Sequence, residues 1–288
     1  MKVIIPKTSG FCPGVRRAEK GVLKLKETHT EVHLHGPLIH NQSYIERLES
    51  LDIKAVDTET LPENSTLVIR THGIPRGEEM LLMKKFHLED MTCPIVKRVQ
   101  KHVEKASQEQ AFVIISGKEN HAEVQGVKSY ADHAVVIQNK EELAAFLANG
   151  DHAIPPDTKK IFILSQTTHS RSFFEYLYQQ VTEFFKDRFP IEIKDTICPI
   201  TEDKEKESLI LQKDSDFTIV IGDPHSSNSK KLYTILKEAD NNTIFVRNLD
   251  DLNNQKTDWQ NINTVLVVSS TSTPQFIEQE IVRYLEAL

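Results

Sequence analysis

The sequence predicts an α/β protein made of three copies of one unit, each with mainly parallel strands. The chain has three cysteines, and proline follows each of them: Cys12-Pro13, Cys93-Pro94 and Cys198-Pro199. A glycine stands 24 residues after each cysteine, at Gly36, Gly117 and Gly222. Strand-like apolar runs alternate with helical patterns, which is typical of parallel sheets with crossover helices. We therefore divide the chain into units 1–86, 87–189 and 190–288.

The composition is that of a soluble globular protein of 288 residues, with 39% apolar and 27% charged residues. The net charge of −7 argues against a general nucleic-acid binder, which usually has a basic surplus. Residues 1–6 enter a strand-like run without the features of a signal or transit peptide, and no apolar run is long enough to span a membrane. We expect a cytoplasmic protein, and an odd number of cysteines there argues against a disulfide framework.

In the first unit, proline after Cys12 suits the first helical position, where its missing N–H is no loss. Cys12 then lies at the N-terminus of a helix, where the dipole and the unpaired amides favour a thiolate. The expected elements of this unit are strands at 3–5, 31–35, 53–56 and 67–69, and helices at 13–25, at 42–51 and from residue 76.

The second and third units repeat this order. After Cys93, three apolar residues recur at helical spacing, namely Val96, Val99 and Val103. The second unit has expected strands at 112–115, 134–137 and 161–164, an inserted loop at 149–160 and a helix at about 172–186. The third unit has expected strands at 218–221, 243–246 and 265–268 and a last helix at 275–285. Asp90 and Asp195 stand three residues before Cys93 and Cys198, which strengthens the case for a repeat.

Polar motifs follow the ends of these strands in all three units. Ligands of open α/β sheets bind beyond the carboxyl ends of the strands, so three such edges facing inward would make one central pocket. Thiolates there select soft metals, which are zinc, Cu(I) or iron–sulfur clusters. An iron–sulfur cube usually takes four cysteines, so three would leave one iron open for a substrate. Zinc held by three cysteines is the alternative, although the sequence lacks the short Cys-x-x-Cys pairs of structural zinc.

The side chains around this expected centre suit a phosphorylated ligand. Imidazoles, hydroxyls and an amide bind phosphate together with the amides of strand-to-helix turns. The candidates are His40, His72, His121, Thr167, Ser226, Ser227, Asn228 and Ser272. Ser, Thr and Asn are also common helix caps, so residues 226–228 have an ordinary alternative reading. Glu123 is either a proton donor or a first-turn glutamate that stabilises the helix dipole.

Eight stretches together resemble the 4-hydroxy-3-methylbut-2-enyl diphosphate reductase family, the IspH/LytB proteins. They are Gly10-Phe11-Cys12-Pro13-Gly14-Val15, Gly36-Pro37-Leu38-Ile39-His40-Asn41, Thr71-His72-Gly73, Thr92-Cys93-Pro94, His121-Ala122-Glu123-Val124, Gln166-Thr167-Thr168, Asp195-Thr196-Ile197-Cys198 and Ser226-Ser227-Asn228. They span nearly the whole chain. The resemblance implies a trefoil of three α/β domains around one central [4Fe–4S] cluster.

The resemblance also implies roles for individual residues. The cluster would be held at three irons by Cys12, Cys93 and Cys198, with the substrate hydroxyl on the fourth iron. The diphosphate pocket would be made by His40, His72, His121, Ser226, Ser227, Asn228 and Ser272. Thr167, with Thr168 beside it, would lie near the substrate hydroxyl, and Glu123 would be the proton source.

The implied reaction is the reductive dehydroxylation of (E)-4-hydroxy-3-methylbut-2-enyl diphosphate to isopentenyl and dimethylallyl diphosphates. This is the last step of the non-mevalonate isoprenoid pathway. Because the sequence has no Gly-x-Gly-x-x-Gly motif for a bound dinucleotide, we expect the electrons to come from a ferredoxin or flavodoxin with its reductase. Two rival functions are an iron–sulfur hydro-lyase acting on a phosphorylated substrate and a non-enzymatic iron–sulfur sensor.

Several positions depart from the family pattern. Asp223-Pro224-His225 replaces a stretch that usually carries a basic residue, and Ser270 stands where glycine is usual. Ala122 replaces a proline, and His169 replaces an apolar residue. The cysteines and Glu123 match the pattern. We therefore expect these departures to alter the affinity of the pocket and the geometry of its loops more than the reaction.

Overall fold

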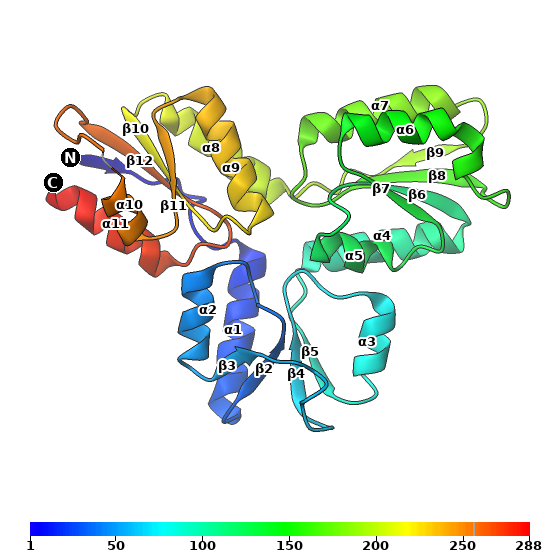
Figure 1. Ribbon diagram of the computed structural model, residues 1–288, viewed down its shortest axis with the longest axis horizontal. Coiled ribbons are helices and arrows are strands. Elements are labelled where there is room, and N and C mark those ends of the chain that lie inside the picture. The colour runs from blue at the N-terminus through cyan, green and yellow to red at the C-terminus, as the bar shows by residue number, and fades with distance from the viewer. Residues whose placement is uncertain (256) are drawn as a thin grey trace. The chain divides into compact units, whose positions relative to one another are not determined.

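The computed structural model describes residues 1–255 and 257–288. The chain divides into two compact units, whose helices and strands are labelled in Figure 1. We call Met1–Val56 with Cys198–Leu288 the terminal unit, and Asp57–Ile197 the central unit. None of the described helices is long and apolar enough to cross a lipid bilayer.

The terminal unit contains one complete parallel sheet with the strand order β1-β12-β10-β11. Its strands are β1 (Lys2–Ile4), β10 (Phe217–Ile221), β11 (Thr243–Val246) and β12 (Thr264–Ser269). A further parallel pair is made by β2 (Val32–His35) and β3 (Ile53–Ala55). The helices of this unit are α1 (Pro13–Thr28), α2 (Gln42–Glu49), α8 (Pro199–Gln212), α9 (Ser227–Ala239), α10 (Leu249–Asn254) and α11 (Gln275–Ala287).

The central unit also contains one complete parallel sheet, ordered β7-β6-β8-β9. Its strands are β6 (Ala111–Ser116), β7 (Ala134–Ile137), β8 (Lys160–Ser165) and β9 (Ile191–Ile193). A parallel pair is made by β4 (Thr66–Ile69) and β5 (His87–Asp90). The helices are α3 (Arg76–Leu82), α4 (Pro94–Gln108), α5 (Ala122–Lys128), α6 (Lys140–Asn149), the 3₁₀ turn η1 (Gly150–Ala153) and α7 (Arg171–Phe185).

The strand before each cysteine pairs with a strand of the preceding repeat. β5 precedes Cys93 and pairs with β4, and β9 precedes Cys198 and pairs with β8. β1 precedes Cys12 and pairs with β12, the last strand of the chain. The expected fold class of three α/β repeats with parallel sheets is confirmed. The division of the chain at 86/87 and 189/190 stays a prediction.

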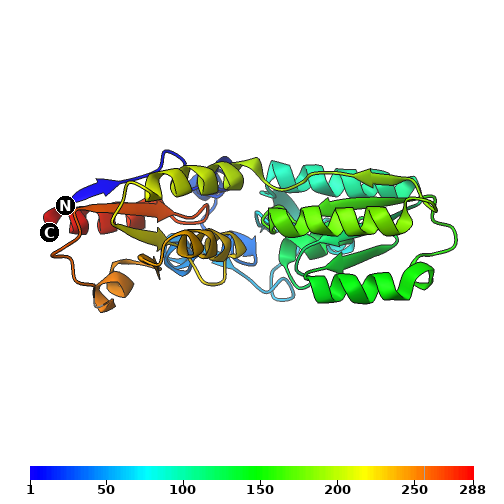
Figure 2. The same cartoon turned by 90° about the horizontal axis from the view of Figure 1, so that it is seen from above.

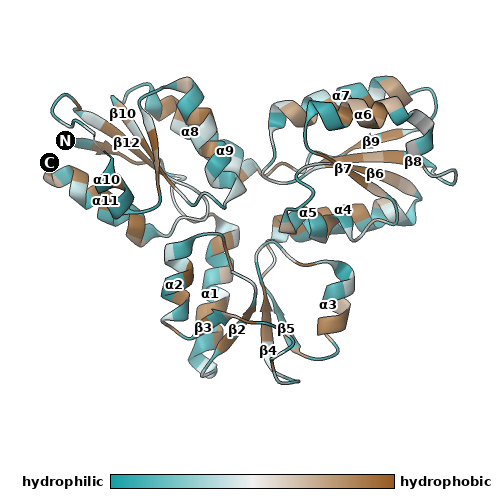
Figure 3. Cartoon of the chain, in the orientation of Figure 1, coloured by the Kyte–Doolittle hydropathy of each residue, from teal (hydrophilic) through white to brown (hydrophobic). Residues whose placement is uncertain are grey.

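Helices cover both faces of the sheet in the central unit (Figures 1 and 2). Successive residues of a strand point to opposite faces. Phe112 and Ile114 pack with α6 and α7, whereas Val113 and Ile115 pack with α4 and α5. Strands buried on both faces are apolar throughout rather than alternating, and these strands are accordingly coloured as hydrophobic in Figure 3.

The sheet of the terminal unit is covered in the same way. Ile219 and Ile221 of β10 pack with α11, and Val220 between them packs with α9. The glycine that follows β10 allows the close approach of α9, because a Cβ on Gly222 would lie 2.6 Å from the Cβ of Ser229. The glycine of the 24-residue spacing is therefore needed here for helix packing.

Candidate functional site

All three cysteines occupy the N-cap of a helix with proline at its start, as the sequence predicts. Cys12 begins α1, Cys93 begins α4 and Cys198 begins α8. Each side chain is partly exposed, and none of the three forms a disulfide within the described residues. Cys12 and Cys198 belong to the terminal unit and Cys93 to the central unit. In the part of the chain that the structure describes, no group of three His, Cys, Asp or Glu side chains forms a metal site, so the three-cysteine ligand set stays a prediction.

The turn before Cys93 is held by an aspartate, and the same turn recurs before Cys198. Asp90 accepts a hydrogen bond of 2.8 Å from the Thr92 N–H, and Asp195 accepts one of 3.1 Å from the Ile197 N–H. Such turns position the following residue. Burial acts to raise the pKa of Asp90, but hydrogen bonds from Lys97 and Thr92 outweigh it and lower the pKa. The carboxylate is therefore ionised and keeps its 2.8 Å ion pair with Lys97.

Cys93 is directly connected to the predicted phosphate-binding loop around His72. The Cys93 N–H donates to the carbonyl of Thr71 at 2.9 Å. Gly73 has a φ of +73°, a conformation that favours glycine. The His72 ring lies 5.6 Å from the ring of His121, edge to face. In the central unit the structure therefore brings together two of the predicted histidines and ties one of their loops to a cysteine.

His121 and Glu123 meet at the start of α5. His121 is the N-cap residue, and its Nδ1 accepts a hydrogen bond of 3.2 Å from the Glu123 N–H. An accepting Nδ1 leaves the proton of a neutral imidazole on Nε2. Glu123 lies in the first turn of α5. This position is the one expected for a glutamate that stabilises the helix dipole, the alternative to a proton donor.

Glu123 is buried, with 3% of its surface exposed, and its carboxyl group contacts Thr167. The Thr167 N–H donates to Oε1 at 2.7 Å, and the Thr167 hydroxyl donates to Oε2 at 2.8 Å. Burial raises the pKa of Glu123, and these two hydrogen bonds only partly oppose the rise. A carboxyl group with a raised pKa holds its proton at higher pH than a solvated one. Such a pair can deliver a proton.

The loop after β8 holds the other predicted residues of the central unit. Gln166 donates through Nε2 to the Thr168 hydroxyl at 3.1 Å and accepts from the Lys118 N–H at 3.1 Å. His169, one of the departures from the family pattern, lies 3.0 Å from the Ser116 hydroxyl through Nδ1. Its ring also contacts Phe173 edge to face at 5.5 Å. This histidine therefore has a packing and hydrogen-bonding role at the end of β6.

In the terminal unit, predicted hydroxyl residues form one cluster at the start of α9. Ser226 is the N-cap and accepts from the Ser229 N–H at 3.3 Å. The Ser272 hydroxyl donates to the Ser226 hydroxyl at 3.3 Å. Asn228 is 6% exposed, and its Nδ2 has no hydrogen-bond partner among the described residues. Because a buried amide without a partner is costly, it is suited to a ligand.

The unusual Ser270 belongs to the same cluster. The Ser229 hydroxyl donates to the Ser270 hydroxyl at 2.8 Å, and the Ser270 hydroxyl lies 3.0 Å from that of Thr273. Ser270 is fully buried. Its hydroxyl group is thus satisfied, which explains how the chain accommodates a serine where glycine is usual.

Asp223 joins two parts of the predicted pocket. It is 5% exposed and accepts from the Gln42 N–H through Oδ2 at 3.1 Å and from the His225 N–H through Oδ1 at 2.8 Å. Gln42 begins α2, two residues after His40. Each oxygen of the carboxylate already accepts from a backbone amide, so this departure acts as a tie between the His40 loop and the turn before Ser226.

Sequence reasoning missed Lys204 of α8. Its side chain is 1% exposed, and its Nζ donates to the carbonyls of Gly10 at 2.8 Å and Ser269 at 2.6 Å. The buried residues of α8 are all polar, namely Thr201, Lys204, Ser208 and Gln212. These four residues are spaced three or four apart, which places them on one face of the helix. This spacing is the signal in the sequence that could have identified the buried polar face.

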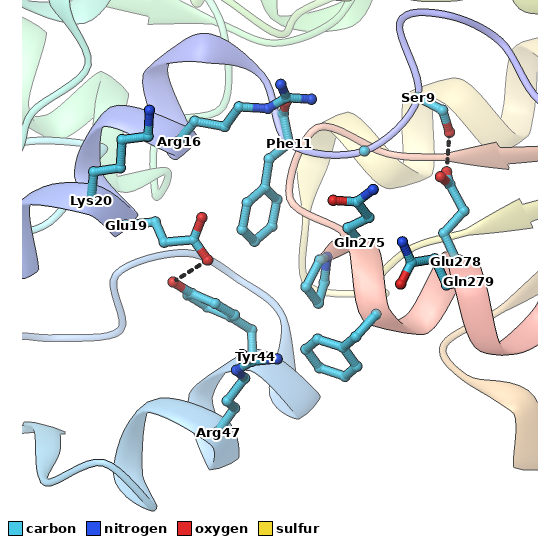
Figure 4. A pocket seen from close by; sticks show the side chains of 13 residues that line it. Ser9, Phe11, Arg16, Glu19, Lys20, Tyr44, Arg47, Gln275, Glu278 and Gln279 are labelled. Carbon is cyan, nitrogen blue, oxygen red and sulfur yellow. Dashed lines mark hydrogen bonds between the residues drawn. The ribbon is translucent and has the colours of Figure 1, made fainter. Parts of the chain in front are cut away.

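A cavity of about 500 Å³ lies beside Phe11 in the terminal unit (Figure 4). It is lined by Ser9, Gly10, Phe11, Arg16, Glu19, Lys20, Tyr44, Arg47, Pro274, Gln275, Phe276, Glu278 and Gln279. Its two carboxylates bind hydroxyl groups: Glu19 accepts from Tyr44 at 3.2 Å, and Glu278 accepts from Ser9. The sequence did not predict this cavity, which adjoins the cysteine loop without containing a predicted site residue.

Comparison with known proteins identifies close relatives along the whole chain. Residues 3–286 match the family model described as LytB protein. A 4-hydroxy-3-methylbut-2-enyl diphosphate reductase of Geobacter sulfurreducens is 32% identical over 288 residues, covering 99% of this chain and 97% of that protein. A solved structure of (E)-4-hydroxy-3-methyl-but-2-enyl diphosphate reductase, called the terminal enzyme of the non-mevalonate pathway, is 30% identical with a TM-score of 0.74 and full coverage of both chains. The E-1-hydroxy-2-methyl-but-2-enyl-4-diphosphate reductase structure from Plasmodium falciparum is 27% identical with a TM-score of 0.86, covering 99% of this chain and 87% of that one.

Proposed function

Since this chain belongs to the LytB protein family, we propose that it reduces (E)-4-hydroxy-3-methylbut-2-enyl diphosphate to isopentenyl and dimethylallyl diphosphates. The names of the similar proteins support the substrate and the reaction. The single observation in this chain that carries the proposal is the buried Glu123 carboxyl group, held by both the N–H and the hydroxyl of Thr167. A reductive dehydroxylation needs a proton donor that turns the leaving oxygen into water.

The proposal includes a [4Fe–4S] cluster bound by Cys12, Cys93 and Cys198, with the α/β repeats arranged as a trefoil around it. The donor set fits, because thiolates are the ligands of iron–sulfur clusters. Each cysteine is also the partly exposed N-cap of a helix. When bound, such a cluster supplies single-electron transfer and one iron without a protein ligand. Because thiol ligands need a reducing compartment, we place the protein in the cytoplasm.

We assign the diphosphate group to a set of hydroxyl, amide and imidazole donors. They are His40, His72, His121, Ser226, Ser227, Asn228 and Ser272. Hydroxyl, amide and imidazole N–H groups at helix N-termini bind phosphate oxygens well. The Nδ2 of Asn228, which has no hydrogen-bond partner among the described residues, supports this assignment.

Glu123 and Thr167 supply the proton, with Thr168 in the adjoining loop. Burial raises the pKa of Glu123 and so favours its protonated form, and the Thr167 hydroxyl lies 2.8 Å from its Oε2. The carbon–oxygen bond of the substrate breaks as this proton reaches the leaving hydroxyl, which departs as water. Two electrons from an external carrier and a second proton on carbon complete the reaction. Addition of that proton at either end of the allyl system gives the two products.

The electrons come from a ferredoxin or flavodoxin with its reductase. Such carriers are small acidic proteins, and positive surface charge steers their encounter. The cavity beside Phe11 suits this partner, because its three cations, Arg16, Lys20 and Arg47, outnumber its two carboxylates on a chain whose net charge is −7. Phe11 is also the residue before Cys12, so this surface adjoins a proposed cluster ligand.

Anaerobic purification followed by electron counting tests the function. We expect about four irons and four sulfides per chain, and two electrons consumed for each substrate converted to isopentenyl or dimethylallyl diphosphate. Conversion without electron uptake would favour the hydro-lyase. A cluster that responds to oxygen or iron, with no turnover of the substrate, would favour the sensor. Stoichiometric zinc without sulfide would overturn the proposal.

A further inference from the structure

The helix that begins at Cys198 also contacts the loop that carries Cys12, through one buried lysine. Lys204 lies in the second turn of α8 and is 1% exposed. Its ammonium group donates to the carbonyl of Gly10, two residues before Cys12, and to the carbonyl of Ser269 at the end of β12. Both contacts lie within the terminal unit.

Gly10 and Ser269 also belong to a small network of backbone hydrogen bonds around Cys12. The Gly10 N–H donates to the Ser269 carbonyl at 3.2 Å, and the Cys12 N–H donates to the Thr271 carbonyl at 3.3 Å. Gly10 has a φ of +74°, so the loop makes a turn there that favours glycine. Backbone hydrogen bonds therefore hold this loop on both sides of Phe11, at Gly10 and at Cys12. The ammonium group of Lys204 adds a third hydrogen bond to the same loop.

Helix packing alone does not require a lysine at this position. Residues six positions after the other two cysteines are Ala18 and Val99, which are 0% and 2% exposed and apolar. Burying an ammonium group is expensive unless it is compensated. Burial lowers the pKa of Lys204 to about 7, although the charges of Cys12 and Glu278 act in the opposite direction. The protonated lysine therefore places an ammonium group against the Cys12 loop, where the other two repeats have an apolar side chain.

We propose that Lys204 is a positioning residue of the metal centre, which ties the Cys12 loop to the helix of Cys198 and offsets the negative charge of the bound thiolates. This inference rests on the proposed function, because it assumes that these thiols hold a cluster. Two neutral carbonyls anchor the ammonium group, and the thiolates supply the negative charge that makes a buried cation favourable. Lys204 contacts no substrate and takes no part in the proton transfer.

The test compares Lys204→Met with a matched variant in anaerobically loaded protein. Lys231→Met is the control, because Lys231 also contacts α8, through a 3.0 Å ion pair with Glu205, and its side chain is only 16% exposed. Both variants remove one lysine that contacts α8, fully buried in one case and partly buried in the other, but only Lys204 touches the Cys12 loop. The measurements are the rate of iron release to a chelator and the midpoint potential of the cluster.

We expect Lys204→Met to release iron at least ~10-fold faster than the wild type and to lower the midpoint potential, because negative charge on the cluster loses a compensating cation. Lys231→Met should resemble the wild type in both measurements. Lys204→Gln keeps a donor without charge, so it should restore iron retention in part while leaving the potential low. If Lys204→Met does not fold, the midpoint potential of the cluster in Lys204→Gln decides the test.

Wild-type potential and iron release in both Lys204 variants would overturn the inference, and so would an equal change in Lys231→Met. A loss of iron with an unchanged potential would also overturn it, because loosening of the fold alone would explain that result. If the wild-type chain itself binds no cluster, the proposed function fails instead. If the wild type binds a cluster and the Lys204 variants behave like it, only this inference fails and the proposed function stands.

Discussion

The central and terminal units each place polar side chains at a strand-to-helix turn, but the two clusters differ in charge and in hydrogen bonding. In the central unit, the buried Glu123 carboxyl group contacts the N–H and hydroxyl of Thr167. In the terminal unit, Ser226 and Ser272 bind each other through neutral hydroxyl groups. A buried acid can hold and release a proton, whereas hydroxyl groups can reorient to meet an anion that brings its own charge. The two repeats have thus taken on different chemistry.

The helices α4 and α8, which follow Cys93 and Cys198, also differ in the polarity of their buried faces. The face that α4 buries contains Val96, Val99 and Val103, whereas the corresponding face of α8 contains Thr201, Lys204 and Ser208. Gln212 at the end of α8 donates to the carbonyl of Leu236 at 3.0 Å. A helix can therefore cover a parallel sheet with polar residues if most of them are hydrogen-bonded. The comparison predicts that substitutions in the two units will affect different properties.

The largest effect is expected from Glu123→Gln. The variant keeps the size and shape of the side chain but removes the acidic proton, so carbon–oxygen cleavage should slow by ~10²–10⁴. The loss should appear in turnover and not mainly in the Michaelis constant. Steady-state kinetics on protein with a full complement of iron and sulfide will measure it. Turnover close to the wild type would exclude Glu123 as the donor and would leave Thr167 or a bound water.

A smaller effect, on substrate affinity, is expected from Asn228→Ala in the terminal unit. A hydrogen bond to a charged group is worth about 1.5–3 kcal/mol, so the Michaelis constant should rise ~10- to 100-fold with turnover changed less. Asn248→Ala is the matched control. Asn248 also follows a strand, but its side chain caps α10 by accepting from the Asp251 N–H at 3.0 Å. A Michaelis constant raised equally in both variants would refute a ligand role for Asn228.

Stability should separate the apolar face of α4 from the polar face of α8. Val103 is fully buried, so Val103→Ala should lower the free energy of unfolding by ~2 kcal/mol through lost contacts and a cavity. Ser208 is also fully buried, but its hydroxyl has no partner among the described residues. Ser208→Ala should be neutral or stabilising, because it removes an unsatisfied group and favours the helix. Denaturant unfolding measures both, and a large loss in Ser208→Ala would show that the hydroxyl is in fact bonded.

The smallest expected effect is a pH dependence of stability caused by Glu123. Burial raises the pKa of Glu123 in the folded chain above its unfolded value. Between these two pKa values the folded state binds more protons, so this group lowers stability as pH rises. Glu123→Gln should therefore gain stability relative to the wild type at alkaline pH and lose that advantage below the unfolded pKa. Thermal unfolding of both proteins across this pH range gives the difference, and a difference independent of pH would contradict the raised pKa.

The sequence alone predicted the repeated parts of the fold with good accuracy. Expected strands at 134–137 and 243–246 have the same bounds in the structure, and the expected helix at 275–285 is α11. Cysteine followed by proline predicted three helix N-termini correctly. These features depend on local chemistry, because proline suits the first turn and apolar runs suit buried strands.

The short strands β5 and β9 were not predicted. Their residues, His87–Asp90 and Ile191–Ile193, alternate with charged side chains and are too few for a clear pattern. Each becomes a strand only because a neighbouring strand of the preceding repeat offers hydrogen bonds. Pairing of β1 with β12 depends on the same long-range partner choice, which composition and spacing do not encode.

By itself, the sequence determined the three thiols, the repeat and the candidate residues, including Glu123. Only the tertiary structure decided how these residues are used. It buries Glu123 against Thr167, which comes 44 residues later, and it turns the Asp223 carboxylate toward the amide of Gln42. It also brings Lys204 to the loop of Cys12. The physical reason is that burial and hydrogen bonding set the charge and the role of a polar side chain, and both depend on neighbours that are distant in the chain.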